Sequence, residues 1–287
     1  MWHEFTYVVK YCLGLDRADR NFVVFPDDIV LVSYPKSGNT WSRFLVANLM
    51  YPDVEVSFAN INRLVADPAL ASKRFLKHLP RPRVLKSHEA FDVRYPKVVY
   101  IVRDPRDVVV SEYFFSIKKR RLDPGVPIQE YVERFIAGKT GSYGTWGENV
   151  ASWVAARYGN PSFLLIRYED LLRETVCQLA SIANFLGLDS SRERLEGIVS
   201  RCSADRMRQL EKEQSDLWSG TKRTRKEILF VRSATSGGWK ESLPTESALR
   251  VEEAWAPLLS WLGYEVQEVE PSSGFPLFSK TRVEPPT

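Results

Sequence analysis

A lysine, a glycine and several small polar side chains gather in the segment Tyr34-Pro-Lys-Ser-Gly-Asn-Thr-Trp41. This segment follows the apolar run 28–33 and precedes a helical pattern over 39–50. A strand that turns tightly into a helix directs free backbone N–H groups and the positive end of the helix dipole at one place. Lys36 adds a positive charge, and Gly38 permits close backbone approach. The pattern predicts a P-loop-like anion site, or else a plain turn with a solvated lysine. Further donors are Ser37, Asn39 and Thr40.

A second pair of residues suits another anionic group. Arg103 closes the apolar run 97–103, and Ser111 follows eight residues later, about two turns into the next predicted helix. Both can converge at the carboxyl edge of a parallel sheet, where such folds bind ligands. The alternative is that Arg103 pairs with Asp104 or Asp107.

One of the three histidines stands where a base would be useful. His88 follows a short predicted strand and lies close to Lys86, whereas His3 is terminal and His78 lies in a basic, proline-rich stretch. A histidine with a pKa near neutrality suits a general base. Glu89 is the reserve candidate, since a desolvated carboxylate can also accept a proton.

Four segments together resemble the soluble sulfotransferases, which use 3′-phosphoadenosine 5′-phosphosulfate (PAPS). Segment 34–41 is similar to their 5′-phosphosulfate loop, and 100–111 is similar to their 3′-phosphate loop. Leu85-Lys-Ser-His88 resembles the strand end with the catalytic histidine, and Arg167-Tyr-Glu-Asp170 resembles the segment whose tyrosine touches adenine. The resemblance spans about residues 28–262.

The resemblance implies a role for each matching residue. His88 would be the base, Lys36 the partner of the leaving 5′-phosphate, and Lys86 a second clamp on the sulfonate. Trp41 and Tyr168 would contact adenine. For Lys86 the alternative is a solvent-facing lysine, and for Trp41 it is core packing. The implied nucleotide-binding set is Lys36, Ser37, Gly38, Asn39, Thr40, Trp41, Arg103, Ser111, Tyr168, Ser203 and Arg232.

The chain also departs from the family pattern. Where relatives usually read Arg-Lys-Gly, this sequence reads Arg232-Ser-Ala234, so affinity for the 3′-phosphate is open. The second adenine segment reads Cys202-Ser-Ala204, which keeps a hydroxyl at Ser203 but lacks the usual aromatic. The dimer motif of animal relatives is absent after Trp239, so the oligomeric state stays open.

Short apolar runs alternate with helical patterns, which predicts an α/β fold. We expect one domain over 1–287, with its core at about 28–262 and a frayed tail from about 271. A central parallel sheet of four to five strands would be flanked by helices. The expected strands are 28–33, 83–86, 97–103 and 163–167, and the later helical regions are 127–158 (interrupted by the Gly-rich loop 138–147), 175–185, 191–213 and 245–262.

Charge and cysteine content restrict the possible partners and compartment. The net charge is only +4, too small to argue for nucleic acid. The surplus lies in 214–240, and we expect the basic loop 214–238 to fold over a polyanionic donor; the alternative is a solvated loop. Three scattered cysteines show no zinc spacing, and neither a membrane span nor a signal peptide is evident. These features predict a cytoplasmic protein without a metal or membrane partner.

The expected function is transfer of the sulfonate of PAPS to a hydroxyl or amine of a small acceptor. Aromatic residues in 131–158 would line an apolar acceptor pocket, or else belong to the core. One alternative is a P-loop-like kinase or ATPase, although no Walker Lys-Ser/Thr pair or aspartate pair for Mg²⁺ is evident. Another is a non-catalytic polyanion-binding module on the same fold.

Overall fold

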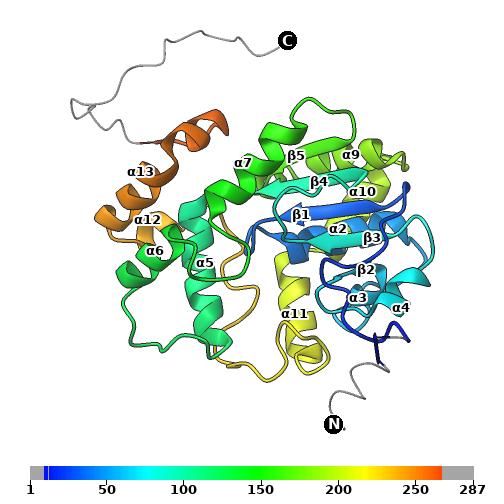
Figure 1. Ribbon diagram of the computed structural model, residues 1–287, viewed down its shortest axis with the longest axis horizontal. Coiled ribbons are helices and arrows are strands. Elements are labelled where there is room, and N and C mark those ends of the chain that lie inside the picture. The colour runs from blue at the N-terminus through cyan, green and yellow to red at the C-terminus, as the bar shows by residue number, and fades with distance from the viewer. Residues whose placement is uncertain (1–9, 12, 267–287) are drawn as a thin grey trace.

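The computed structural model describes residues 10–11 and 13–266 and contains a five-stranded sheet in the order β2-β3-β1-β4-β5 (Figure 1). All neighbouring strands are parallel, and Val30 of β1 lies beside Leu85 of β3 and Val98 of β4. The α/β class and the four predicted strands are confirmed. The fifth, β2, is only two residues long, too short to produce a periodic pattern. The strands are β1 (Ile29–Ser33), β2 (Val65–Ala66), β3 (Val84–Ser87), β4 (Lys97–Val102) and β5 (Phe163–Arg167).

Helices cover both faces of the sheet, because alternate strand residues face opposite sides. Val30 and Val32 pack in one core cluster with residues of α5, α6, α7 and α13, while Ile29 and Leu31 pack in another with α2, α9 and α10. The helices are α2 (Asn39–Met50), α3 (Ile61–Leu64), α4 (Lys73–Lys77), α5 (Pro105–Lys118), α6 (Ile128–Ile136), α7 (Trp146–Arg157), α8 (Tyr168–Arg173), α9 (Thr175–Leu186), α10 (Arg192–Arg201), α11 (Ala204–Gln214), α12 (Trp239–Ser242) and α13 (Thr245–Trp261).

Local capping explains where several helices begin. The Asp104 side chain accepts the backbone N–H of Arg106, and Pro105 occupies the first turn, so α5 begins directly after β4. Thr145 and Glu148 form a capping box that starts α7. Ser203 caps α11, so the helical pattern over 191–213 is two helices. The expected tail from 271 lies outside the described residues.

The segment between α11 and α12 is irregular, as expected, but it has more buried anchors than its composition suggested. Trp218 and Thr221 are buried within it. The buried Lys118 ammonium at the end of α5 lies 3.3 Å from the Glu211 carboxylate and donates to the carbonyls of residues 225 and 228. Glu211 in turn accepts the N–H groups of residues 230 and 231. This buried pair, the Lys118–Glu211 latch, fastens the segment beside α5 (Figure 1).

Replacing Lys118 with Met should loosen this segment. The substitution leaves Glu211 buried without its cation, which typically destabilises a protein by about 3–5 kcal/mol. We expect a lower melting temperature and faster trypsin cleavage between residues 222 and 226. Lys119→Met is the matched control, because the Lys119 ammonium donates to the carbonyl of residue 219 near the surface and forms no ion pair within 4 Å among the described residues. Equal cleavage of the two variants would contradict the latch.

Candidate active site

The turn between β1 and α2 is built to receive an anion. Lys36 and Gly38 both have positive φ, 66° and 89°. Helix α2 begins at Asn39 with no side-chain cap and no acidic residue in its first turn, so its first N–H groups have no partner within the helix. The Ser37 hydroxyl oxygen is buried and has no hydrogen-bond partner. Unused donors and the helix dipole therefore favour a negatively charged group here.

An aromatic slot stands beside this turn. A Cβ atom at Gly38 would lie 2.4 Å from the Tyr168 ring, so only glycine fits. Trp41 meets Tyr168 edge-on, with ring centroids 6.1 Å apart, and its indole N–H donates to the Cys202 carbonyl at 2.9 Å. The slot therefore offers ring surfaces next to the anion site, suitable for a nucleobase.

A cavity of about 210 Å³ joins the turn, the slot and the start of α5. It gathers nine of the residues predicted to bind nucleotide: Lys36, Gly38, Asn39, Thr40, Trp41, Arg103, Ser111, Tyr168 and Arg232. Ser37 is buried within the turn and does not line the cavity. The Ser203 hydroxyl is outside it as well, because it caps α11, although its neighbour Ala204 lines the cavity.

The Lys36 ammonium lies between two phenyl rings. Its nitrogen is 4.1 Å from the Phe115 ring centroid and 4.5 Å from that of Phe230. Burial, with a smaller effect from the nearby charge of Arg103, lowers the pKa of Lys36 to about 7. A bound anion would restore the charged form by supplying the missing negative charge.

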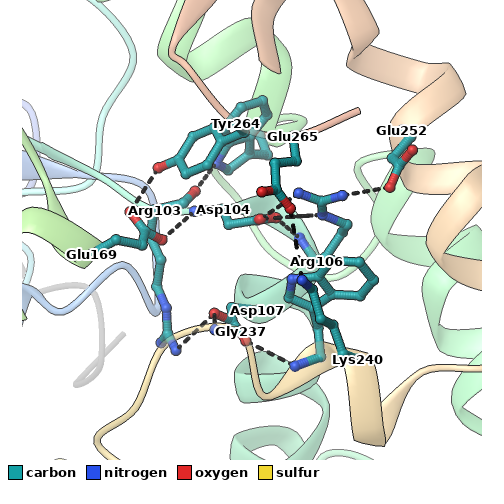
Figure 2. Close-up of polar contacts among 12 residues, drawn as sticks. Arg103, Asp104, Arg106, Asp107, Glu169, Gly237, Lys240, Glu252, Tyr264 and Glu265 are labelled. Carbon is teal, nitrogen blue, oxygen red and sulfur yellow. Dashed lines mark hydrogen bonds and ion pairs between the residues drawn. The ribbon is translucent and has the colours of Figure 1, made fainter. Parts of the chain in front are cut away.

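Arg103 combines structural contacts with unused hydrogen-bonding capacity. Its guanidinium donates to the carbonyls of Lys36 (3.2 Å) and Thr235 (3.1 Å) and stands 4.4 Å from the Tyr168 ring centroid. The guanidinium also lies 3.7 Å from the Asp107 carboxylate (Figure 2). This is one of the two ion pairs that the sequence offered as an alternative to ligand binding. Its Nε is buried without a partner, so the cavity still has a donor for an anion.

The acidic residues next to Arg103 hold backbone and neighbouring helices. Asp107 accepts the N–H groups of Gly237 (2.8 Å) and Trp239 (3.1 Å), fixing the chain just after the cavity-lining residues 231–234. Asp104 pairs with Arg106 rather than Arg103, and Arg106 also contacts Glu252 of α13 (Figure 2). This network fixes the start of α5, and the one acidic residue in it that pairs with a cavity-lining cation is Asp107.

His88 lies at the carboxyl end of β3 in a defined tautomer. Its Nδ1 is 2.7 Å from the Ser33 carbonyl oxygen. Because a carbonyl can only accept, Nδ1 carries the proton and Nε2 keeps its lone pair. Burial, followed by the charge of Lys86, lowers the pKa of His88 to about 3. The expectation of a near-neutral pKa is therefore wrong for the unliganded protein, because the ring is desolvated and faces a cation.

A second, small cavity of about 20 Å³ adjoins His88. Lys86 lies here and not in the larger cavity, and its ammonium is 2.6 Å from the Asp67 carboxylate. Tyr143 covers the imidazole edge-on, with ring centroids 5.5 Å apart. The carboxylate of Glu89, the reserve base, forms an ion pair with Arg20. The reserve candidate is therefore already paired with a cation in this structure.

Several contributors to the site have weak or no signals in the sequence. Phe115 stands one helical turn after Ser111, a spacing that could have indicated a shared face. Phe230 and Asp67 approach from distant segments. Asn149, which donates to the His88 carbonyl at 3.0 Å, is indistinguishable in sequence from other helical asparagines. Across the described part of the chain, no cluster of three or more His, Cys, Asp or Glu residues is arranged for a metal. No described helix has the length and apolarity to cross a membrane.

Comparison with known proteins defines the class of this site. The family model for the sulfotransferase domain matches residues 26–263, so the chain belongs to the sulfotransferase family. Human sulfotransferase 4A1 is 32% identical over 206 residues, which are 67% of this chain and 71% of the relative. Rat sulfotransferase 2B1 is 30% identical over 240 residues, 79% and 69% of the two chains.

Solved structures agree in fold. A mouse sulfotransferase complexed with PAP, the desulfated product of PAPS, superposes with a TM-score of 0.70 at 24% identity and covers 86% of this chain and 88% of that one. Retinol dehydratase in complex with androsterone and PAP gives 0.69 at 20% identity, with 88% and 85% covered. The protein is thus a PAPS-dependent sulfotransferase with a single α/β domain.

The lowered pKa of Lys36 makes nucleotide binding pH-dependent. Below pH 7 Lys36 is protonated in the free and bound protein, so its contribution to affinity is complete. A bound phosphate should raise its pKa, so as the pH rises above the free value of about 7 binding should require proton uptake and affinity for PAP should fall. Calorimetry in buffers of different ionisation enthalpy measures this uptake. Lys36→Arg stays charged and should lose the dependence; the same slope in both proteins would contradict the assignment.

Proposed function

We propose that the acceptor is a small hydroxylated molecule and that His88 Nε2 accepts its proton during transfer of the sulfonate. The bond between His88 Nδ1 and the Ser33 carbonyl carries this proposal, since it leaves an unprotonated nitrogen at the same sheet edge as the anion turn. A neutral base needs no prior deprotonation at physiological pH.

The donor would extend across the larger cavity. The 5′-phosphosulfate fits the N–H groups at the start of α2, with Lys36 beside the leaving phosphate; the buried Ser37 would contribute through its place in the turn. Adenine fits beside Trp41 and Tyr168. The 3′-phosphate fits beside the unused Nε of Arg103, with Ser111 and Arg232 on either side. Ser203 would contribute indirectly, because its side chain caps α11 and so helps to position that helix.

Catalysis would rest on positioning and charge. PAPS is already activated, so the transfer needs an in-line approach and a cation at the departing phosphate oxygen. Lys36 supplies that cation in a cavity whose lining, among the described residues, contains no carboxylate. Lys86 would turn from Asp67 to the sulfonate as the acceptor enters. The proposed reaction uses no metal.

Partners and compartment follow from the relatives. The named ligand of one structural neighbour, androsterone, is a small hydroxylated molecule. We propose a comparable size class here, a cytoplasmic location, and no nucleic-acid or membrane partner. Membership of the sulfotransferase family argues against the kinase or ATPase alternative. The presence of His88, Lys36 and Lys86 favours a catalytic protein over a module that only binds polyanions.

Replacing His88 with Ala should separate chemistry from binding. We expect PAP affinity to stay within a few-fold and turnover of a phenol to fall on the order of 10²-fold or more. His78→Ala is the matched control, because exposed His78 also places Nδ1 2.7 Å from a carbonyl but lies outside both cavities described above. Turnover that survives in His88→Ala would transfer the role to Glu89.

Replacing Arg103 or Ser111 with Ala should weaken binding of PAP but leave its 3′-dephospho analogue nearly unaffected. A lost hydrogen bond to a charged group is worth about 1.5–3 kcal/mol, roughly 10- to 150-fold in affinity. Titration of both nucleotides into each variant gives the comparison. Equal losses for both nucleotides would mean that these side chains only shape the cavity.

A further inference from the structure

Glu112, the residue after Ser111 in α5, is a buried carboxylate that the proposed reaction does not use. It is 7% exposed, and its Oε2 has no hydrogen-bond partner. Within the described residues it forms no ion pair at 4 Å or less. A buried carboxylate oxygen without a hydrogen-bond partner is costly and marks a place where a donor or cation is missing.

The Glu112 carboxylate faces the loop that covers His88. A Cβ atom at Gly141 would lie 3.9 Å from Glu112 Oε1, and the neighbouring Thr140 hydroxyl is close enough to stabilise the same carboxylate. The same loop carries Tyr143, which packs against the imidazole of His88. Glu112 therefore borders the acceptor side of the site.

Glu112 also lies near the position proposed for the sulfonate. Phe115, on the same helix as Glu112, contacts the Lys36 ammonium. The hydroxyls near Glu112 are engaged elsewhere: Tyr34 donates to the Gly144 carbonyl at 3.2 Å, and Tyr131 pairs with Ser116 at 2.9 Å. The carboxylate thus keeps an unused acceptor between Lys36 and the loop over His88. Burial, only partly offset by Thr140 and Lys36, raises the pKa of Glu112 to about 7.

Charge at the small cavity by His88 is close to balanced. Asp67 pairs with Lys86, and Glu89 pairs with Arg20. The third carboxylate of the lining, Asp19, is exposed to solvent, and the buried Arg43 adds positive charge near His88. The charge preference of the acceptor side therefore rests on Glu112.

We propose that Glu112 binds a protonated amine of the acceptor, so that the enzyme selects hydroxylated amines. This inference rests on the proposed function, because it takes His88 as the position of the reacting hydroxyl. The ammonium donates to Glu112 Oε2, and the Thr140 hydroxyl accepts a second N–H. The loop 138–145 must move aside for the acceptor; Gly138 and Gly144, both at positive φ, are the points where its backbone can turn.

Two probes isolate the ammonium. Tyramine and 4-ethylphenol share the phenol and the two-carbon chain, and only tyramine carries an amine. Their dissociation constants are measured on protein saturated with PAP, which needs no turnover, and kcat/KM is measured with PAPS. The expected result is that wild-type protein prefers tyramine and that near-isosteric Glu112→Gln reduces the preference roughly 10- to 150-fold, the effect of losing a charged hydrogen bond.

Two further variants separate contact from general attraction. Glu130→Gln removes an exposed carboxylate from neighbouring α6 and should keep the preference. Asp19→Asn removes charge at the cavity by His88 and should reduce the preference less than Glu112→Gln does. An equal reduction by Asp19→Asn would mean that the local field, not Glu112, selects the amine.

The remaining outcomes distinguish failure of the proposed role of Glu112 from failure of the proposed sulfonate transfer. An unchanged ratio in Glu112→Gln, or wild-type protein that binds tyramine no more tightly than 4-ethylphenol, overturns the role of Glu112 even when both phenols are sulfonated. If tyramine binds more tightly in a manner that depends on Glu112, but no sulfonated 4-ethylphenol is formed, the proposed phenol transfer is overturned instead. Melting temperatures of the variants show whether each remains folded.

Discussion

Lys36 lies in the larger cavity with two phenyl rings close to its ammonium and no carboxylate within ion-pair distance in the described part of the chain. The surrounding structure depends on keeping this charge without a counter-ion. A carboxylate beside Lys36 would stabilise the free protein but would compete with phosphate for the same ammonium. The rings instead exclude water and offer a weak attraction through their π faces. The turn that carries Lys36, the segment that carries Phe230 and helix α5 together enclose this unpaired ammonium.

The acidic residues near the cavity satisfy a second requirement, that the chain on either side of Arg232 be held in place. Asp107 binds backbone N–H groups after Arg232, and Glu211 binds backbone N–H groups before it. Carboxylates directed at backbone amides fix the chain on both sides of Arg232. The guanidinium itself stays directed at the cavity, 4.5 Å from the Phe114 ring centroid. These carboxylates thus hold the chain that carries Arg232, while the Arg232 guanidinium supplies positive charge to the cavity.

The sequence was sufficient for features encoded within short stretches. The β-branched run before Tyr34 and the helical pattern after it predicted β1 and α2, and the ends of parallel strands necessarily meet at one edge. It was insufficient where a property depends on residues distant in sequence. The tautomer of His88 depends on the carbonyl of Ser33, and the pairing of Lys86 depends on Asp67, which follows a strand of two residues. Burial, which sets the pKa values of Lys36 and His88, has no local signal.

The packing of Tyr168 against Gly38 bears on the entropy of binding. The Tyr168 ring is buried against a residue with no side chain, and the Trp41 indole is tied to a backbone carbonyl, before any nucleotide arrives. Ordering a mobile side chain at an interface costs about 0.5–1.5 kcal/mol, and two rings already fixed avoid most of that cost. The aromatic slot is therefore preorganised, and most of the ordering that accompanies binding is left to the nucleotide itself.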